Sequence, residues 1–380
     1  MGLIVLFVIF RIFDLLISYL SPSFIAYLGF FPYKELLKDY LLPQWIYSFA
    51  NFDGIHYLLI AQNGYSQYEQ AFFPLYPILI RFFSLVFKNY LISSLIISYV
   101  CFLTGLFVFK KYLELILKNK RQVVWTLIFL IIFPSSFFFG AVYTESLFFL
   151  TFISSLYFFQ KKKYSHSAVF AFFCSLTRLI GIFILIPFLV KIFLEKESLR
   201  NKIKKYFLVI LSPIIGFASY CYYLFKTTGD AFFFFNSQPA FGANRTTEII
   251  VLPRVIFRYI KIFLTAAHDF QYYVSLFEFI VFVIIFSVLI YGLINLFKKR
   301  KDMKYFSSRL GLNLFSLINI TLPTLTGTFS SLPRYALFSF SFFIVLSSIK
   351  TRCVKTAIAF VFLIFHVLML ALFIQGYFVS

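Results

Sequence analysis

Apolar runs recur along the whole of this chain, and many are close to the roughly 20 residues that a helix needs to cross a bilayer. The runs are continuous rather than alternating, which favours helices over a β-barrel. Only 13% of the 380 residues are charged, whereas a soluble domain has about 25%. Polar side chains are therefore too few to cover a surface in contact with water. The sequence predicts an all-α polytopic membrane protein, with residues 1–380 forming a single integral membrane domain.

We predict about 11 transmembrane helices, and the basic residues between them indicate their orientation. The predicted spans lie near 3–21, 90–109, 122–136, 144–160, 164–178, 180–194, 206–225, 272–297, 306–323, 335–349 and 356–377. One set of loops carries roughly twice as many Lys and Arg as the other, and the richer side is expected in the cytoplasm. The N-terminus is then cytoplasmic and the C-terminus lies outside. This orientation requires that residues 71–88, which contain Pro74 and Pro77, lie at the outer interface without crossing.

Other features narrow the function classes. The net charge of +21 would indicate nucleic acid in a soluble protein, but here it fits the basic loops of a membrane protein, so we expect a membrane-lipid environment and no nucleic-acid partner. The four cysteines are isolated and form no disulfide or zinc pattern. The sequence has no GxxxxGK[ST], HExxH or GxSxG motif, which argues against an ATP-driven pump, a zinc protease or a serine hydrolase.

The predicted orientation brings the unusual polar segments to the extracytoplasmic face. They are the first outer loop 32–88, the turn 134–145, the link near 177–178, the second long loop 226–271 and the segment 324–335. The first loop is the most distinctive, because it keeps many polar and aromatic residues in a chain otherwise rich in Phe, Leu and Ile. We therefore expect any reaction or binding site on this face.

Asp53 is the first candidate in that loop. It follows Asn51 and precedes Gly54, a setting typical of a turn that presents a carboxylate outward. His56 shares a face with Asp53 if a helix begins here, and the structural alternative is that Asp53 only caps this helix. Nearby rings suit a sugar or a lipid chain, although some of them also fit an interfacial aromatic belt. These rings belong to Tyr57, Tyr65, Tyr68, Phe72, Phe73 and Tyr76.

Three charged residues on the same face have two interpretations each. Glu145 opens a predicted span, where the helix dipole alone favours an acid. Arg178 is the lone cation of an outer turn, and a guanidinium at a membrane surface usually has a partner or a ligand such as phosphate. Its structural alternative is a salt bridge to Glu145 or Asp53, and Arg334 has the same ambiguity. Two such arginines on one face favour an anion site.

Arg11 and Asp14 are three residues apart in the first predicted span, so they share one face of the helix. We predict that they form a structural ion pair inside the bundle.

The segments that hold these residues also resemble a known family. "FANFDGIHYLLIAQNGY", which leads to "AFFPLYPILIR", is similar to the signature of the PIG-V family, the GPI mannosyltransferases that add the second mannose, and their bacterial relatives. "FPSSFFFGAVYTESLFFL", "SLTRLIGIF" and "GTFSSLPRYALFSF" follow in the family's order, over roughly residues 45–350. The family usually has Trp before the Asp, where this chain has Phe52, which lacks the indole N–H.

This resemblance implies a C-type glycosyltransferase (GT-C) bundle in the cell membrane, or in the ER membrane if the source is eukaryotic. Such enzymes take a sugar from a polyprenyl phosphate on the outer or lumenal face. The implied donor is polyprenyl-phosphate-mannose, and the acceptor is a lipid or glycan. Asp53 matches the acid that the first outer loop of these enzymes supplies. The candidate substrate-binding residues around it are His56, Tyr57, Glu145, Arg178, Arg334 and Tyr335.

The sequence is also compatible with a bound metal ion and with two other functions. Asp53 with His56 or Glu145 could hold a divalent ion, but no dense cluster of oxygen ligands demands one. A lipid-linked saccharide flippase is the main alternative function, although a transporter is expected to place its charges at the bilayer midplane. An assembly partner without activity is another alternative. The sequence defines neither the acceptor nor the oligomeric state.

Overall fold

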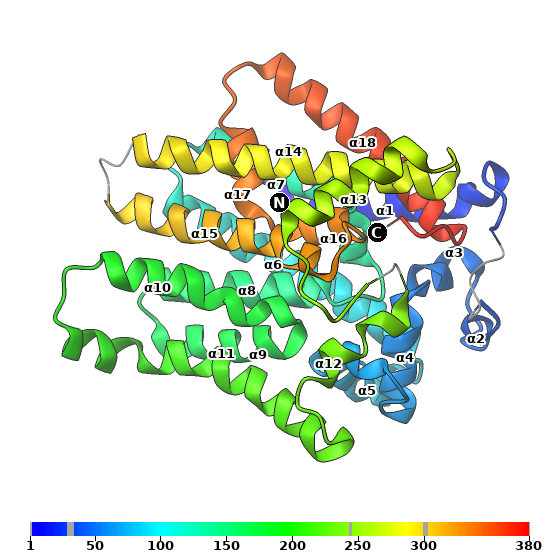
Figure 1. Cartoon of the computed structure of the whole chain (residues 1–380), viewed down its shortest axis with the longest axis horizontal. Coiled ribbons are helices and arrows are strands. Elements are labelled where there is room, and N and C mark those ends of the chain that lie inside the picture. The colour runs from blue at the N-terminus through cyan, green and yellow to red at the C-terminus, as the bar shows by residue number, and fades with distance from the viewer. Residues whose placement is uncertain (1, 29–33, 243–244, 299–302, 380) are drawn as a thin grey trace.

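The structure is a computed structural model that describes residues 2–28, 34–242, 245–298 and 303–379. Within these residues all regular elements are helices, as predicted (Figure 1). Five are long and apolar enough to cross a membrane: α1 (Gly2–Leu20), α6 (Tyr90–Ile116), α11 (Leu199–Thr228), α14 (Phe270–Lys298) and α18 (Arg352–Ile374). By these helices the chain is a multi-pass α-helical membrane protein.

The remaining α-helices are shorter or less apolar. They are α2 (Lys34–Lys38), α3 (Gln44–Tyr47), α4 (Asp53–Asn63), α5 (Leu75–Phe87), α7 (Lys120–Ile131), α8 (Glu145–Gln160), α9 (Tyr164–Thr177), α10 (Leu185–Leu194), α12 (Phe233–Asn236), α13 (Leu252–Thr265), α15 (Met303–Thr321), α16 (Leu332–Tyr335) and α17 (Phe340–Ser347). Short 3-10 segments connect several of them, including η4 (Ser136–Gly140) and η5 (Leu179–Ile184).

The prediction of about 11 transmembrane helices is not confirmed. Each predicted span coincides with helical structure, but five of them are short or broken, and a sixth, at 306–323, is a continuous helix that is less apolar than the five above. Two examples show why. The span predicted at 122–136 ends as a helix at Ile131, three residues before Pro134, because a proline disfavours helical geometry in the residue before it. The span predicted at 335–349 is divided among α16, a 3-10 turn and α17. Apolar composition therefore overstated the lengths of the helices.

Residues 71–88 contain α5, which has only 13 residues and packs against α4 and α6. A helix of this length is too short for an ordinary crossing. One of its faces is buried through Tyr76 and Ile80, while Phe82 and Val86 on the other are more than half exposed. The element has the shape expected of an interfacial helix, and its placement relative to the bilayer stays a prediction. Residues 32 and 33 of the same predicted loop lie outside the described residues.

The centre of the fold is α8, which packs against α6 on one side and α9 on the other, while α9 packs on α11. Glycines allow the close approaches. A Cβ on Gly105 of α6 would lie 2.6 Å from the Phe149 ring of α8, and one on Gly216 of α11 would lie 2.5 Å from the Phe172 carbonyl oxygen of α9. Small residues at such contacts are typical of helix packing in membranes. The α8 helix consequently holds its first residue, Glu145, at a fixed point inside the protein.

The segment between α7 and α8, which contains the turn predicted on the extracytoplasmic side, is buried inside the protein. Nearly every residue from 133 to 149 is buried. The reason is that the turn is apolar and its backbone polar groups find partners in distant segments. Val142 N–H donates to the Phe49 carbonyl at 3.0 Å, and the Ser135 hydroxyl donates to the Pro333 carbonyl at 2.6 Å. This buried turn therefore ties the first outer loop to the segment that contains Arg334.

Candidate functional site

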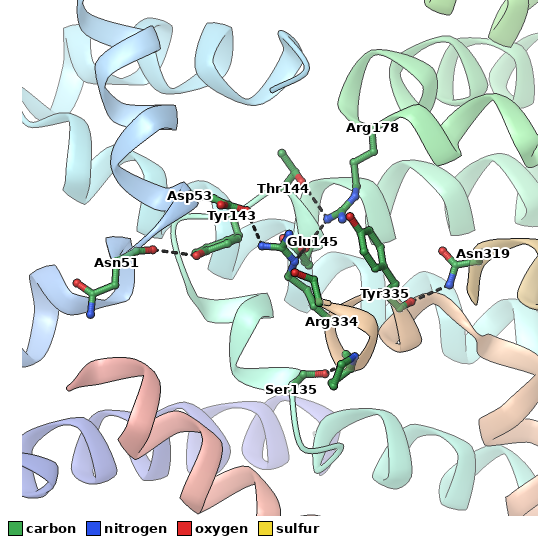
Figure 2. Close-up of polar contacts among 12 residues, drawn as sticks. Asn51, Asp53, Ser135, Tyr143, Thr144, Glu145, Arg178, Asn319, Arg334 and Tyr335 are labelled. Atoms are coloured by element: carbon green, nitrogen blue, oxygen red, sulfur yellow. Dashed lines mark hydrogen bonds and ion pairs between the residues drawn. The ribbon is translucent and has the colours of Figure 1, made fainter. Parts of the chain in front are cut away.

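The buried turn positions the two segments that carry Asp53 and Arg334. The Tyr143 hydroxyl donates to the Asn51 carbonyl at 2.8 Å, and the Asn51 side chain donates to the Phe373 carbonyl at 2.9 Å, at the end of α18 (Figure 2). Asn51 is thereby fixed two residues before Asp53. Because Ser135 holds Pro333 from the same turn, Asp53 and Arg334 are both anchored to one rigid piece of backbone.

Asp53 is the first residue of α4, and its carboxylate is directed at Arg334 rather than at the helix backbone. The residue at the cap position is Phe52, and no side chain caps this helix. Asp53 Oδ2 lies 2.6 Å from Arg334 Nη1 (Figure 2). The alternative in which Asp53 only caps the helix is therefore wrong.

Glu145 lies between the two arginines and is fully buried. Its Oε1 atom pairs with Arg178 Nη1 and lies 3.7 Å from Arg334 Nε. Arg178 Nη1 also donates to the Thr144 hydroxyl at 3.2 Å (Figure 2). The salt bridges that the sequence offered as structural alternatives for both arginines thus exist, and the four charges form one connected row.

The row stabilises its own charges. Burial alone would raise the pKa of Asp53, but the charge and the hydrogen bond of Arg334 outweigh burial and lower that pKa below its ordinary value. Asp53 is therefore ionised at neutral pH. For Arg334, burial opposes the charge, but Asp53 and Glu145 raise the pKa of the guanidinium well above its usual range. The guanidinium also lies 5.4 Å from the centre of the Tyr143 ring, a cation–π distance.

The charged row borders a cavity of about 300 Å³. Asp53, Arg178 and Arg334 contribute its polar wall together with Arg245, which comes from the predicted second outer loop. Arg245 has neutral partners: Nη1 donates to Gln238 Oε1 at 3.0 Å and Nη2 to the Ser331 hydroxyl at 3.4 Å. Three arginines and one carboxylate, Asp53, thus line the cavity, and Glu145 lies behind them, so these five groups together carry one positive charge in excess. Such a balance attracts an anion.

The other wall of the cavity is apolar and aromatic. Its residues come from the first outer loop, η5, the segment around α12 and the end of α15, and they include Phe72, Phe73, Leu179, Ile180, Phe234, Phe235, Phe241, Ile249, Leu322 and Leu325. A charged wall that faces an apolar wall suits a ligand with one anionic and one oily part.

The structure brings most of the predicted site residues together. Tyr57 and Tyr335 line the cavity beside the charged row, and Arg178 Cζ lies 5.5 Å from the centre of the Tyr335 ring. Glu145 lies behind the arginines and does not line the cavity. His56 is absent from the lining of this cavity, and its predicted role in substrate binding stays a prediction. Its Nδ1 pairs with Glu69 Oε1 at 3.1 Å, and its ring stacks on Phe72 at 5.3 Å. Phe72 thus separates His56 from the cavity.

Several polar residues of the cavity were missed by sequence reasoning, and Arg245 and Asn319 are two examples. Arg245 is one of several basic residues in a long loop, and no spacing distinguishes it from the others. Asn319 lies within a predicted span, and its amide donates to the Tyr335 carbonyl at 2.7 Å. A polar amide in an apolar run was the only available signal for it.

The geometry does not fit a divalent metal ion. Asp53 and Glu145 are each paired with arginine, and within the described ranges no three His, Cys, Asp or Glu side chains gather closely enough to hold a metal. Metal sites of this type need several oxygen ligands that are free of competing cations.

No model of a known protein family matches the sequence, and no curated protein matches it. Two solved structures that resemble the fold are crystal structures of the Archaeoglobus fulgidus oligosaccharyltransferase. One is tethered by a disulfide bond to an acceptor peptide with the NVT sequon, with 13% identity and a TM-score of 0.48. The other is the apo form, with 12% identity and a TM-score of 0.45. Both alignments cover 98% of this chain, which spans 55% and 56% of the archaeal structures.

Proposed function

We propose that the chain is a glycosyltransferase of the GT-C type that moves a sugar from a polyprenyl-phosphate donor to a lipid or glycan acceptor on the extracytoplasmic face. The observation that carries the proposal is the cavity itself. An ionised carboxylate, an excess of arginine and an apolar wall meet there around one cavity. Mannose as the sugar is a proposal that rests only on the resemblance of these segments to PIG-V signatures, which no family model bears out.

Asp53 acts as the general base in this proposal. Arg334 occupies its Oδ2 atom, which leaves Oδ1 to accept the proton of the acceptor hydroxyl. The acceptor oxygen then forms a bond to the anomeric carbon while the bond from that carbon to the phosphate oxygen breaks. The electron pair leaves with the lipid phosphate. A single displacement inverts the anomeric centre, so a β-linked donor gives an α-linked product.

The leaving phosphate gains negative charge as this bond breaks, and the arginines stabilise it. Arg245 is the natural primary contact, because its partners are neutral, whereas Arg178 and Arg334 already neutralise Glu145 and Asp53. Glu145 acts as a positioning residue that holds both arginines at fixed distances. The polyprenyl chain lies against the apolar wall, where the Phe73 and Phe234 rings meet edge to face with their centroids 5.6 Å apart.

Membrane vesicles that contain the full chain test this proposal. Labelled polyprenyl-phosphate-mannose is supplied with a mixed membrane extract as acceptor, and transfer of the label is measured. We expect transfer by the wild type and its loss in Asp53→Asn, which keeps the shape but removes the base. Asp230→Asn is a matched control, because Asp230 is absent from the cavity lining and caps the short α12 region through the Phe232 N–H at 2.8 Å. Equal transfer by wild type and Asp53→Asn would refute the role of Asp53.

A further inference from the structure

A second cavity, of about 720 Å³, lies where α17 connects to α18 and α7 begins. The α17–α18 connection is at the top of Figure 1. Lys355 and Phe373 mark the two ends of α18, and eighteen residues of helix separate them by about 27 Å. Phe373 contacts Asn51 next to the candidate active site. The second cavity is therefore remote from the first and lies at the end of the molecule that the basic loops assign to the cytoplasm.

The lining of this cavity is strongly basic. Its charged residues are Lys120, Arg121, Lys350, Arg352 and Lys355, and no Asp or Glu occurs among the described residues that line it. A smaller cavity of about 350 Å³ shares Asn119, Gln122 and Ser348 with it and adds Lys118 and Arg309. Basic loops on one side of a membrane are ordinary, so the charge alone does not define a site.

Lys355 goes beyond the ordinary pattern, because it is only 7% exposed. Its ammonium makes no hydrogen bond or ion pair with any residue that the structure describes, and it lies 4.9 Å from the centre of the Trp125 ring, which also lines the cavity. Most of this side chain is buried, while its ammonium nitrogen is not among the fully buried atoms, so the cation stays accessible at the cavity without an acidic partner among the described residues. Such a side chain next to a cavity is expected to meet an anion there.

The start of α18 provides independent support. Its first turn contains no acidic residue, and Thr351 at the cap position makes no side-chain hydrogen bond to it. The first N–H groups of this helix therefore have no side-chain acceptor, while Arg352 and Lys355 stand at the positive end of its dipole. Both features are unfavourable unless an anion lies at this helix end.

We propose that this cavity binds a phosphate group, with Lys355 as its buried contact and Arg352 and the α18 N–H groups as further donors. The apolar rims of the cavity, formed by Val124 and Ile349, favour a phosphate carried by an anionic phospholipid of the cytoplasmic leaflet. A free phosphate would meet the same donors. The proposal is independent of the glycosyltransferase activity.

Trp125 provides the measurement. The chain has two tryptophans, so Trp45→Phe leaves Trp125 as the only one. The purified full chain in neutral detergent is titrated with short-chain phosphatidylglycerol, with phosphatidylcholine and with inorganic phosphate while Trp125 emission is followed. We expect saturable binding of phosphatidylglycerol but not of phosphatidylcholine, and binding weaker by about fivefold or more in Lys355→Met. Saturation by inorganic phosphate would also support the phosphate site and would identify the free anion as a ligand.

Lys226→Met is the matched control, because Lys226 also lies over an aromatic ring, at 5.7 Å from Tyr222, but lines neither basic cavity. Arg352→Gln, at an exposed position, replaces Lys355→Met if the latter does not fold. The absence of a saturable response to both phosphatidylglycerol and inorganic phosphate would overturn the proposal. Equal responses to the two phospholipids without a response to inorganic phosphate would overturn it as well, and so would unchanged affinity in both Lys355→Met and Arg352→Gln.

Discussion

Two arginine–aspartate pairs in this protein have the same chemistry but different surroundings. Arg11 Nη1 and Asp14 Oδ2 lie 3.1 Å apart on one face of α1, and Asp14 Oδ1 also lies 2.8 Å from His366 Nε2 of α18. This pair is enclosed by the bundle, as the sequence predicted. Arg334 and Asp53 are 281 residues apart in sequence and lie at the edge of a cavity, where 24% of the Asp53 side chain is exposed. The first pair can only stabilise the fold, whereas the second can also meet a ligand.

The largest expected difference between the pairs is in catalysis. Asp53→Asn should lower sugar transfer by about 100-fold to 10,000-fold, the usual contribution of a general base. Asp14→Asn should leave the transfer rate of each folded molecule far above that of Asp53→Asn, because Asp14 does not line the cavity. Initial rates in vesicles, normalised to the amount of folded protein, test both statements. Similar losses of transfer rate in the two variants would show that contact with the cavity does not give Asp53 a role that Asp14 lacks.

The next difference concerns stability. Asp14→Leu leaves Arg11 as an unpaired buried charge, which should destabilise the protein by about 3–5 kcal/mol. The double variant Arg11→Met with Asp14→Leu should recover most of this loss, because both charges are replaced by apolar groups. Thermal unfolding in detergent measures the effect. If the double variant were as unstable as the single one, the pair would do more than balance charge.

Arg245 tests whether the excess charge of the cavity has a function. Arg245→Gln should lower kcat/KM for the lipid-linked donor by about tenfold or more, since a hydrogen bond to a charged group contributes about 1.5–3 kcal/mol. Arg254→Gln is the control, because Arg254 is exposed and belongs to the same predicted loop. Donor titrations at saturating acceptor provide the measurement. An unchanged donor dependence in Arg245→Gln would remove this arginine from the phosphate contact.

The two ion pairs also show which contacts could be predicted from the sequence and which could not. The Arg11–Asp14 pair was predictable because three residues of helix place both side chains on one face. Asp53 and Arg334 could be named as candidates, but their contact depends on the turn 134–145, whose burial the sequence did not indicate. The number of transmembrane helices is not confirmed, because Phe-rich segments such as α8 are also apolar when they are buried in protein. Arg245 was missed because its importance comes from having neutral partners, which only the folded chain defines.

The smallest expected effect is a shift in pH dependence. Arg334 lowers the pKa of Asp53 below its ordinary value of 3.8, so Asp53 is deprotonated throughout the neutral range. The stability that a carboxylate with a depressed pKa contributes is present above its unfolded-state pKa and is lost as the pH falls through its folded-state pKa. Protonation of Asp53 also removes the general base. The decrease of kcat/KM at acidic pH that Asp53 causes, the acid limb of the rate profile, should therefore lie below pH 3.8.

Arg334→Gln removes the opposing charge and leaves burial, which raises the pKa. The acid limb should then move to higher pH by about one unit or more. Arg178→Gln serves as the control, because Arg178 pairs with Glu145 and not with Asp53, so its acid limb should stay in place even if its rate falls. Rate profiles between pH 3 and pH 8, with folding checked at each end by circular dichroism, distinguish the two variants. Identical acid limbs in Arg334→Gln and wild type would mean that Asp53 is not the group whose protonation stops transfer. The Arg334–Asp53 pair would then differ from the Arg11–Asp14 pair only in its position at the cavity.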